Sequence, residues 1–138
     1  MNTEQNCIFC KITKGEIPAH KVYEDEYTLA FLDIHPNTKG HTLVVPKNHF
    51  ENIYSIPPET LARTILVVQK VALALKHGLD ADGINIFNNN EREAGQIIDH
   101  SHFHVIPRGP RDNFPTLPHV EYAEGEIESV TKSIKENL

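Results

Sequence analysis

The chain has 138 residues, which is enough for one ordinary domain and short for two. Its 13 basic and 19 acidic side chains give a formal net charge of −6. A net acidic chain lacks the broad basic surface that binds long nucleic acid, so we expect a small ligand instead. No apolar stretch approaches the roughly 20 residues of a membrane span, and the polar N-terminus has no signal-peptide core. We therefore expect a cytoplasmic protein with no membrane partner.

The first part of the chain predicts one short helix and three strands. Residues 8–13 are expected to form a short helical turn that ends at Lys14-Gly15. A polar turn and a loop containing Pro36, Asn37 and Gly40 separate the β-favourable stretches that follow. The three predicted strands are residues 20–24, 28–32 and 41–45, with Pro46 ending the third.

The second part predicts one long helix, two strands and a short terminal helix. The long helix begins at Pro57-Pro58, runs to about His77 and is closed by Gly78. Strands at residues 83–88 and 97–106 follow, then an extended segment over 108–118 and a short helix over 124–137. About five strands with short links and one long helix predict an antiparallel sheet of the α+β class.

The long helix has an unusually wide apolar surface. Its predicted core stripe recurs at spacings of four and three, and further apolar residues widen it beyond one face. A deeply buried helix would explain this width, but a domain of this size has little room for one. We therefore expect a homodimer in which this helix partly contacts a second subunit. The stripe is Leu61, Ile65, Val68, Ala72 and Leu75, widened by Leu66, Val67, Val71 and Leu73.

Nine histidines are present, and three of them, His100, His102 and His104, alternate within five residues. On a strand, alternate side chains share a face, so neighbouring histidines would lie roughly 6.6 Å apart and the outer two about 13 Å apart. Solvent-facing histidines without a role are the simplest alternative. A three-histidine metal site is another, but it fits a straight strand poorly.

The segments around this run are recognisable. Gly95-Gln96 followed by residues 100–107 (His-Ser-His-Phe-His-Val-Ile-Pro) resembles the histidine-triad (HIT) family motif of alternating histidine and apolar residues. The resemblance continues upstream through residues 29–36 and 41–49. It covers roughly residues 7–108 of one domain that we expect to span 1–138, with 109–138 as a tail. Ser101 stands where the family usually has an apolar residue and is expected to affect packing more than chemistry.

This resemblance implies a nucleotide hydrolase or transferase that acts at the α-phosphate through a covalent nucleotidyl-histidine intermediate, without a catalytic metal. By position, His102 would be the nucleophile and His104 a second catalytic residue. A neutral imidazole can attack phosphorus with one nitrogen while the other donates to a backbone carbonyl. The implied contacts are Asp33 at the ribose, Ile34 at the base, and His41, Asn89, Gly95 and Gln96 around the phosphate. Asp33 and Asn89 could instead be plain turn residues, and Ile97 replaces a serine of the family's eukaryotic branch.

Cys7 and Cys10 are three residues apart, which is a poor disulfide framework and a good half of a metal site. The resemblance implies that His49 and His100 complete one structural zinc site per chain. Two free cysteines without a metal are the alternative. The other histidines, His20, His35, His77 and His119, are expected on the surface.

We therefore expect a homodimeric hydrolase of the HIT type that binds a purine nucleotide or a nucleotide conjugate. The candidate substrates are nucleoside phosphoramidates, adenylated small molecules and dinucleoside polyphosphates, with residues 108–118 expected to shape the leaving-group pocket. Two other classes stay open at this point. One is a nucleotide-binding or scaffold protein with negligible turnover, and the other is a zinc-dependent protein in which the histidine run binds the metal.

Overall fold

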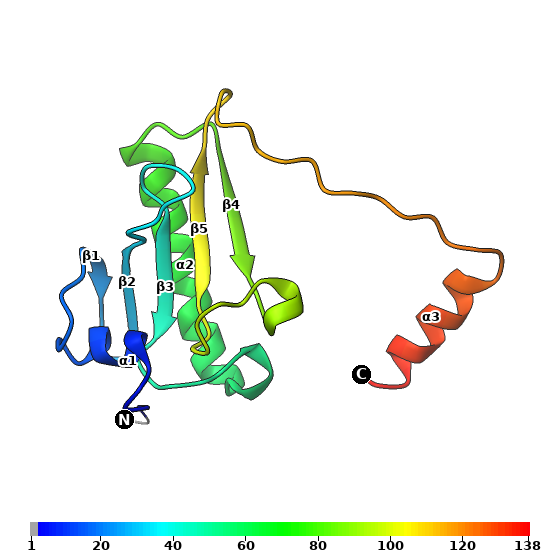
Figure 1. Cartoon of the computed structure of the whole chain (residues 1–138), viewed down its shortest axis with the longest axis horizontal. Helices are drawn as coiled ribbons and strands as arrows, with labels where there is room; N and C mark the ends of the chain where they lie inside the picture. The colour runs from blue at the N-terminus through cyan, green and yellow to red at the C-terminus, as the bar shows by residue number, and fades with distance from the viewer. Residues whose placement is uncertain (1–2) are drawn as a thin grey trace.

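The structure, a computed structural model, describes residues 3–138. Five strands form one antiparallel sheet in the order β1-β2-β3-β5-β4, as Figure 1 shows. The strands are β1 (Lys21–Glu24), β2 (Thr28–Leu32), β3 (Thr42–Pro46), β4 (Gly83–Asn88) and β5 (Phe103–Arg108). The helices are α1 (Ile8–Thr13), α2 (Pro58–Gly78) and α3 (Glu126–Lys135), with 3-10 turns at Ile53–Ser55 and Arg92–Ala94. The expected α+β class is confirmed.

A tight turn joins β1 to β2 and starts the antiparallel meander. The Asp25 carboxylate accepts hydrogen bonds from the backbone N–H groups of Tyr27 and Thr28, both at 2.8 Å. A carboxylate that binds the backbone two and three residues on is a common turn former. β2 then pairs with β3 over its whole length, from Thr28 opposite Pro46 to Leu32 opposite Thr42.

Helix α2 covers one face of the sheet and supplies most of the core there. Its first turn begins with Pro58, whose missing N–H would have no partner inside a helix at that position. The predicted stripe is only partly right, since Ile65 is 44% exposed and the buried side turns towards Thr64 and Val67. The buried cluster on this face consists of Val67, Val68, Val71 and Leu75 of α2 with Ala30, Val44, Phe103 and Val105 of the sheet.

The opposite face of the sheet is covered at one end by α1. Phe9 and Ile12 pack there against a second buried cluster from β2 and β3. Those two strands are therefore buried on both faces, which explains why they read as continuous apolar runs rather than alternating ones. No helix in the described part of the chain is long and apolar enough to cross a membrane.

Strand β5 begins later than the sequence predicts. The expected strand over 97–106 is wrong in its first half, because only residues from Phe103 onward pair with β3 and β4. Pro46 ends β3 and has no N–H to extend the ladder. Upstream of Phe103 the backbone bonds elsewhere, since the Ser101 N–H donates to the Phe50 carbonyl at 2.7 Å. The backbone consequently bends at residues 98–100, and residues 101 and 102 lie outside the strand.

Alternation does hold inside β5. Phe103 and Val105 face α2, whereas His104 and Ile106 line a cleft on the other face of the sheet. After β5 the chain leaves the body as an extended arm that carries α3, seen at the right of Figure 1.

Candidate active site and metal centre

A cleft of about 910 Å³ lies on the face of the sheet that α1 partly covers. Its floor is apolar, with Phe9, Ile12, Phe31 and Leu43, and its polar residues gather at one side. The predicted site residues that line it are Asp33, Ile34, His41, Asn89, Gly95, His102 and His104. Residues separated by as many as 71 positions in the sequence, such as Asp33 and His104, therefore share one cavity. An apolar cavity with a few converging polar groups is typical of a small-ligand site.

His102 is held in one tautomer by the backbone. Its ring nitrogen Nδ1 lies 2.7 Å from the carbonyl oxygen of His100, and a carbonyl only accepts, so Nδ1 carries the proton. The other nitrogen, Nε2, is then the unprotonated one. Burial lowers the pKa of His102 below its usual value, which keeps the ring neutral at pH 7. This is the state that a nucleophilic imidazole requires.

A chain of hydrogen bonds fixes the tautomers of two more histidines. The backbone N–H of Asn37 donates to His41 Nδ1 at 3.0 Å, so His41 carries its proton on Nε2. That Nε2 lies 2.9 Å from His104 Nδ1, which must accept. His104 therefore carries its own proton on Nε2 and can donate it to a ligand. Burial lowers the pKa of His41, and it lowers the pKa of His104 to about 4, so both rings are neutral donors at pH 7.

The rings of these histidines lie close together in the cleft. Ring centroids are 4.9 Å apart for His102 and His104, and 5.1 Å apart for His104 and His41. The expectation that His102 and His104 share a face agrees with this arrangement. Asp33 lies beside the cluster, with its Oδ2 3.7 Å from His41 Nε2.

Asp33 and Ile34 occupy the mouth of the cleft. The Asp33 Oδ1 accepts the backbone N–H of His35 at 2.9 Å, which fixes the carboxylate and leaves lone pairs for a ligand. Its side chain is 20% exposed. Ile34 is 78% exposed and lines the same cavity.

Gln96 differs from the other predicted phosphate contacts in its surroundings. Its side chain is buried, and its Oε1 accepts the Glu91 N–H at 2.7 Å while Nε2 donates to the carbonyls of Glu51 and Ile98. The amide therefore shapes the loop before the histidine run rather than lining the cleft. Gly95 and Asn89 of this loop do line it, and Gly95 adopts a positive φ of 90° that favours glycine.

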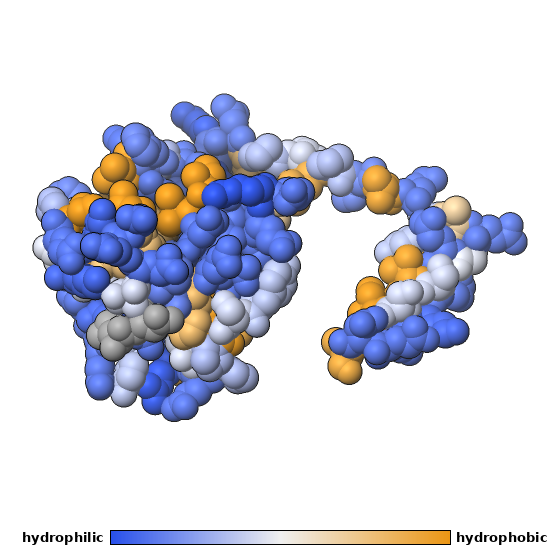
Figure 2. Space-filling model, turned by 60° about the horizontal axis from the view of Figure 1, so that its bottom comes forward, coloured by the Kyte–Doolittle hydropathy of each residue, from blue (hydrophilic) through white to orange (hydrophobic). Residues whose placement is uncertain are grey.

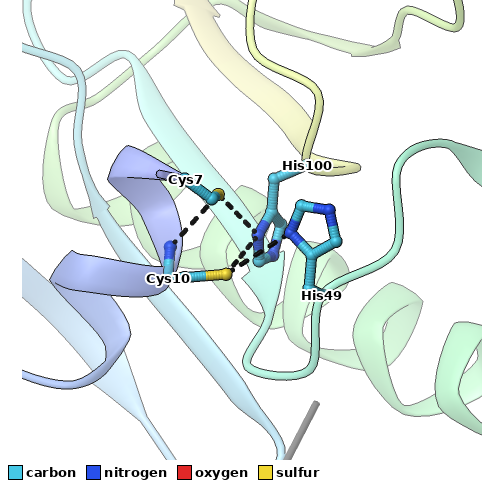
Figure 3. A group of neighbouring side chains, drawn as sticks. All are labelled: Cys7, Cys10, His49 and His100. Atoms are coloured by element: carbon cyan, nitrogen blue, oxygen red, sulfur yellow. Dashed lines mark hydrogen bonds between the residues drawn. The ribbon is translucent and has the colours of Figure 1, made fainter. Parts of the chain in front are cut away.

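The second cluster joins α1 to the sheet. The side chains of Cys7, Cys10, His49 and His100 converge, with their ligand atoms all within 4.8 Å of one another, and Figure 3 shows the two sulfurs beside the two rings. Cys7 Sγ and Cys10 Sγ lie 3.4 and 3.5 Å from His100 Nδ1, and Cys10 Sγ lies 3.4 Å from His49 Nδ1. These are the four residues that the sequence suggested for a metal.

The geometry of this cluster fits a tetrahedral metal. With Zn–S near 2.3 Å and Zn–N near 2.0–2.1 Å, tetrahedral angles put sulfur and nitrogen ligands about 3.5 Å apart. The His100 Nε2 lies 2.8 Å from the Pro46 carbonyl and so carries the proton, which leaves Nδ1 with a lone pair towards the sulfurs. Burial raises the pKa of the Cys10 thiol to about 11, and a bound cation would offset that effect. Four residues with this donor set can hold one metal ion.

Asp33, His41 and His104 also come within metal-binding range of one another. Their hydrogen bonding argues against a resident ion there. His41 Nε2 and His104 Nδ1 share one proton at 2.9 Å, and a cation between them would have to displace it.

Several contributors to the site lie outside the residues expected from the sequence. The Phe9 and His102 rings pack edge to face, with ring centroids 5.2 Å apart. Asn88 donates to the His102 carbonyl at 2.9 Å from the end of β4. His20 and His35, expected only as surface residues, are exposed but line the cleft. By contrast, no residue of the segment 108–118 lines the cleft within the described chain. Among these residues, only Asn88 could have been suspected from the sequence, because it adjoins the predicted contact Asn89 at the end of a strand.

The chain is similar in sequence and in fold to known proteins. The family model of the HIT domain matches residues 14–111. A Bacillus subtilis protein named hit is 44% identical over 142 residues, covering 100% of this chain and 98% of that protein. A crystal structure of a HIT family member from the same organism matches with a TM-score of 0.91 at 43% identity, over 97% of this chain and 98% of the other.

Other relatives bear on chemistry. An adenosine 5'-monophosphoramidase from Candida albicans is 42% identical over 112 residues, covering 78% of this chain and 74% of that protein. An adenylylsulfatase from Arabidopsis thaliana is 39% identical and covers 79% of this chain and 55% of its own length. A zinc-bound histidine triad protein from Mycobacterium smegmatis matches with a TM-score of 0.76 at 38% identity, over 96% of this chain and 98% of that one. The match to the family model and the similarity to relatives in sequence and in fold show that the chain belongs to the histidine-triad (HIT) family.

Proposed function

We propose that this protein hydrolyses nucleotide conjugates at the α-phosphate, with His102 as the nucleophile. The observation that carries the proposal is the short contact between His102 Nδ1 and the His100 carbonyl, which leaves Nε2 unprotonated beside an open cleft. Burial keeps the ring neutral and therefore reactive.

The reaction divides into two displacements at one phosphorus atom. First, His102 Nε2 forms a bond to phosphorus, and the bond to the leaving group breaks. The leaving group departs with the bonding electron pair and takes a proton from water. Water then attacks the same phosphorus, the P–N bond breaks, and Nε2 regains its lone pair as the water's proton is released. Each step is easier than one direct displacement by water.

The neighbouring residues supply fixed hydrogen-bond donors and acceptors. We assign His104 Nε2–H to a phosphate oxygen, since the chain from Asn37 through His41 leaves that proton free to donate. Preorganised donors of this kind stabilise the charge that develops in the transition state. The Asp33 carboxylate accepts hydrogen bonds from the ribose hydroxyls, and the Ile34 side chain contacts the base at the mouth of the cleft. Gly95 and Asn89 line the cleft where the phosphate binds, and Gln96 holds their loop in place through its hydrogen bond from the Glu91 N–H.

The substrate class follows from the relatives and from the cleft. Two relatives, which are 42% and 39% identical to this chain over the aligned residues, are named adenosine 5'-monophosphoramidase and adenylylsulfatase. The apolar floor offers stacking area for a purine, and it carries few polar groups that would read base edges. Adenosine phosphoramidates are accordingly the first substrates to test.

We propose one structural zinc ion per chain, held by Cys7, Cys10, His49 and His100. A four-ligand site of this kind is closed, so the ion would stabilise the fold rather than activate water. The ion would fasten α1 to the loop before β5. The zinc-bound relative from Mycobacterium smegmatis supports this assignment.

We also propose a homodimer and a cytoplasmic location. Strand β4 is at an edge of the sheet, and Ile86 on it is 47% exposed. On α2, Ile65, Leu66 and Leu73 are 44, 58 and 53% exposed, a wide apolar surface for an isolated monomer. Cys7 and Cys10 form no disulfide within the described chain, which favours a reducing compartment.

A direct test combines turnover with intact-mass analysis. Wild-type protein mixed briefly with an adenosine phosphoramidate and quenched in base should show a transient adduct of one nucleotidyl group. His102→Ala should show none and lose several orders of magnitude in kcat. His119→Ala, which changes an exposed histidine outside the cleft, serves as the control. A His102→Ala variant that keeps more than about a tenth of the activity would overturn the proposal, and nucleotide binding without an adduct in the wild type would indicate a binding protein.

A further inference from the structure

Helix α3 has an apolar side on which no other described residue of the chain packs. Ile127, Val130 and Ile134 recur at helical spacing and are 52, 37 and 57% exposed. Figure 2 shows hydrophobic side chains gathered along one side of this helix. The helix has only 10 residues, and isolated helices shorter than about 12–15 residues are marginal in water. Such a helix needs a surface to pack against.

The arm that carries α3 leads away from the body of its own chain. It leaves the end of β5 and passes beyond the β4 edge of the sheet, as Figure 1 shows. Every residue from 113 to 138 is exposed. Pro110, Pro115 and Pro118 favour an extended backbone, so residues 109–125 can span on the order of 50 Å.

A matching apolar groove lies at the opposite side of the body. It has a volume of about 490 Å³ and lies between the C-terminal half of α2 and the β1–β2 edge of the sheet. Its walls are mainly aliphatic, from Val22, Leu32, Val71, Leu75 and Leu79. The arm points away from this groove in its own chain, because β1 and β4 are opposite edges of the sheet.

A second copy joined along the β4 edge would bring such a groove within reach. Five strands spaced about 4.8 Å apart make a sheet roughly 24 Å wide. An arm on the order of 50 Å long can therefore cross a neighbouring sheet from its β4 edge to its β1 edge. The contact would be reciprocal, since each chain has both an arm and a groove.

Charge complements this fit. Glu126 and Glu128 lie in the first turn of α3, and Glu121 and Glu124 precede it. Lys39 and Lys70 line the groove, and neither is in an ion pair within the described residues. The similarity to the Bacillus subtilis structure covers 97% of this chain, so it includes most of the arm as well as the body.

We propose that α3 of each chain docks its apolar side into the groove between α2 and β1 of a second copy, so that two chains hold each other by exchanged arms. This inference rests on the proposed homodimer and adds the surface that stabilises it. The nucleotide cleft lies on the other face of the sheet and is not part of the contact.

Cross-linking between chains tests the location of α3. Ala74 is exposed at the groove, so Ala74→Cys in an affinity-tagged chain is paired with Ile127→Cys in an untagged chain. The zinc-loaded chains are mixed, allowed to exchange subunits and treated with a short bismaleimide. Tagged and untagged chains should become covalently linked. Ser129→Cys, on the other side of α3, should give at least fivefold less product. Linkage only within a doubly substituted chain, no linkage, or equal yields from Ile127→Cys and Ser129→Cys would overturn the proposal.

Light scattering across a dilution series tests the energetic role of the arm. Adding two charges to the apolar side, with Ile127→Glu and Ile134→Glu together, should raise the dimer dissociation constant at least tenfold. Ser129→Glu places the same charge on the other side and should leave it unchanged. A dissociation constant that the double substitution does not change would contradict the exchange of arms. The adduct at His102 is measured separately, so failure of either proposal is recognised without the other.

Discussion

Replacing His41 tests whether a hydrogen-bond relay sets the reactivity of the site. His41 Nε2–H donates to His104 Nδ1 at 2.9 Å, and the ring of His41 is only 3% exposed. His41→Leu removes that donor and leaves a half-buried nitrogen without a partner, which costs about 1–3 kcal/mol. If this cost falls on the transition state, kcat/KM drops about 5- to 150-fold. His41→Gln offers an amide N–H in place of the imidazole and should recover one hydrogen bond, worth about 0.5–1.5 kcal/mol or about 2- to 12-fold.

The assay has a kinetic and a spectroscopic part. Initial rates with an adenosine phosphoramidate give kcat/KM for wild type, His41→Leu and His41→Gln. Nitrogen NMR of the His104 ring reports its tautomer directly, and we expect the Nε2–H form in the wild type and a mixture in His41→Leu. The relay is refuted if the two variants have the same kcat/KM within about twofold, or if His104 keeps its tautomer in His41→Leu.

Three further predictions follow from the pKa values, the metal cluster and a close contact. Burial lowers the pKa of His102 below its usual 6.5, and it lowers the pKa of His104 to about 4, so both rings stay neutral as the pH falls through 6.5. The acid limb of kcat/KM should therefore have its midpoint below 6.5, and a midpoint at 6.5 or above in a pH–rate profile would contradict this. Cys10→Ser should abolish the binding of zinc, as measured by elemental analysis, and lower Tm by about 10 °C. His119→Ser should change neither the zinc content nor Tm. An unchanged Tm after loss of the metal would argue against a structural ion. At Gly40, with φ of 100°, an added Cβ would lie 2.5 Å from Leu79 Cδ1, the end of an exposed side chain that can shift, and 3.2 Å from Pro107 Cγ. Gly40→Ala should therefore destabilise the fold by about 2–3 kcal/mol in urea unfolding, against about 1–2 kcal/mol for Gly15→Ala, which has a positive φ and open space. Equal losses would mean that these contacts relax fully.

The local patterns of the sequence predicted much of the fold. The helix over 8–13 and the strands over 28–32 and 83–88 have the predicted bounds, because periodicity and turn residues act over a few neighbours. The first half of the strand expected over 97–106 was wrong for a non-local reason. The His100 ring bonds the carbonyl of Pro46, and the Ser101 N–H bonds that of Phe50, so contacts about 50 residues away end the ladder.

The candidate site shows the same division between local and distant information. The spacing of Cys7 and Cys10 indicated half of a metal site, and the resemblance to the HIT family implied the other two ligands and most residues of the cleft. The protonation of each ring could not be read from the sequence, because it depends on backbone groups such as the Asn37 N–H and the His100 carbonyl. Likewise, the Gln96 amide faces backbone groups of its own loop, an arrangement that only the folded loop determines.

Mapping the covalent adduct by peptide mass spectrometry tests the central claim most directly. Wild-type protein is mixed with an adenosine phosphoramidate, quenched in base within the first turnovers, digested and sequenced by fragmentation. The nucleotidyl group should be found on His102 alone, since Nδ1 of that ring is occupied by the His100 carbonyl and Nε2 is the nitrogen available to phosphorus. A label on His104 or on any other side chain, or steady turnover with no labelled peptide at any time, would contradict the account.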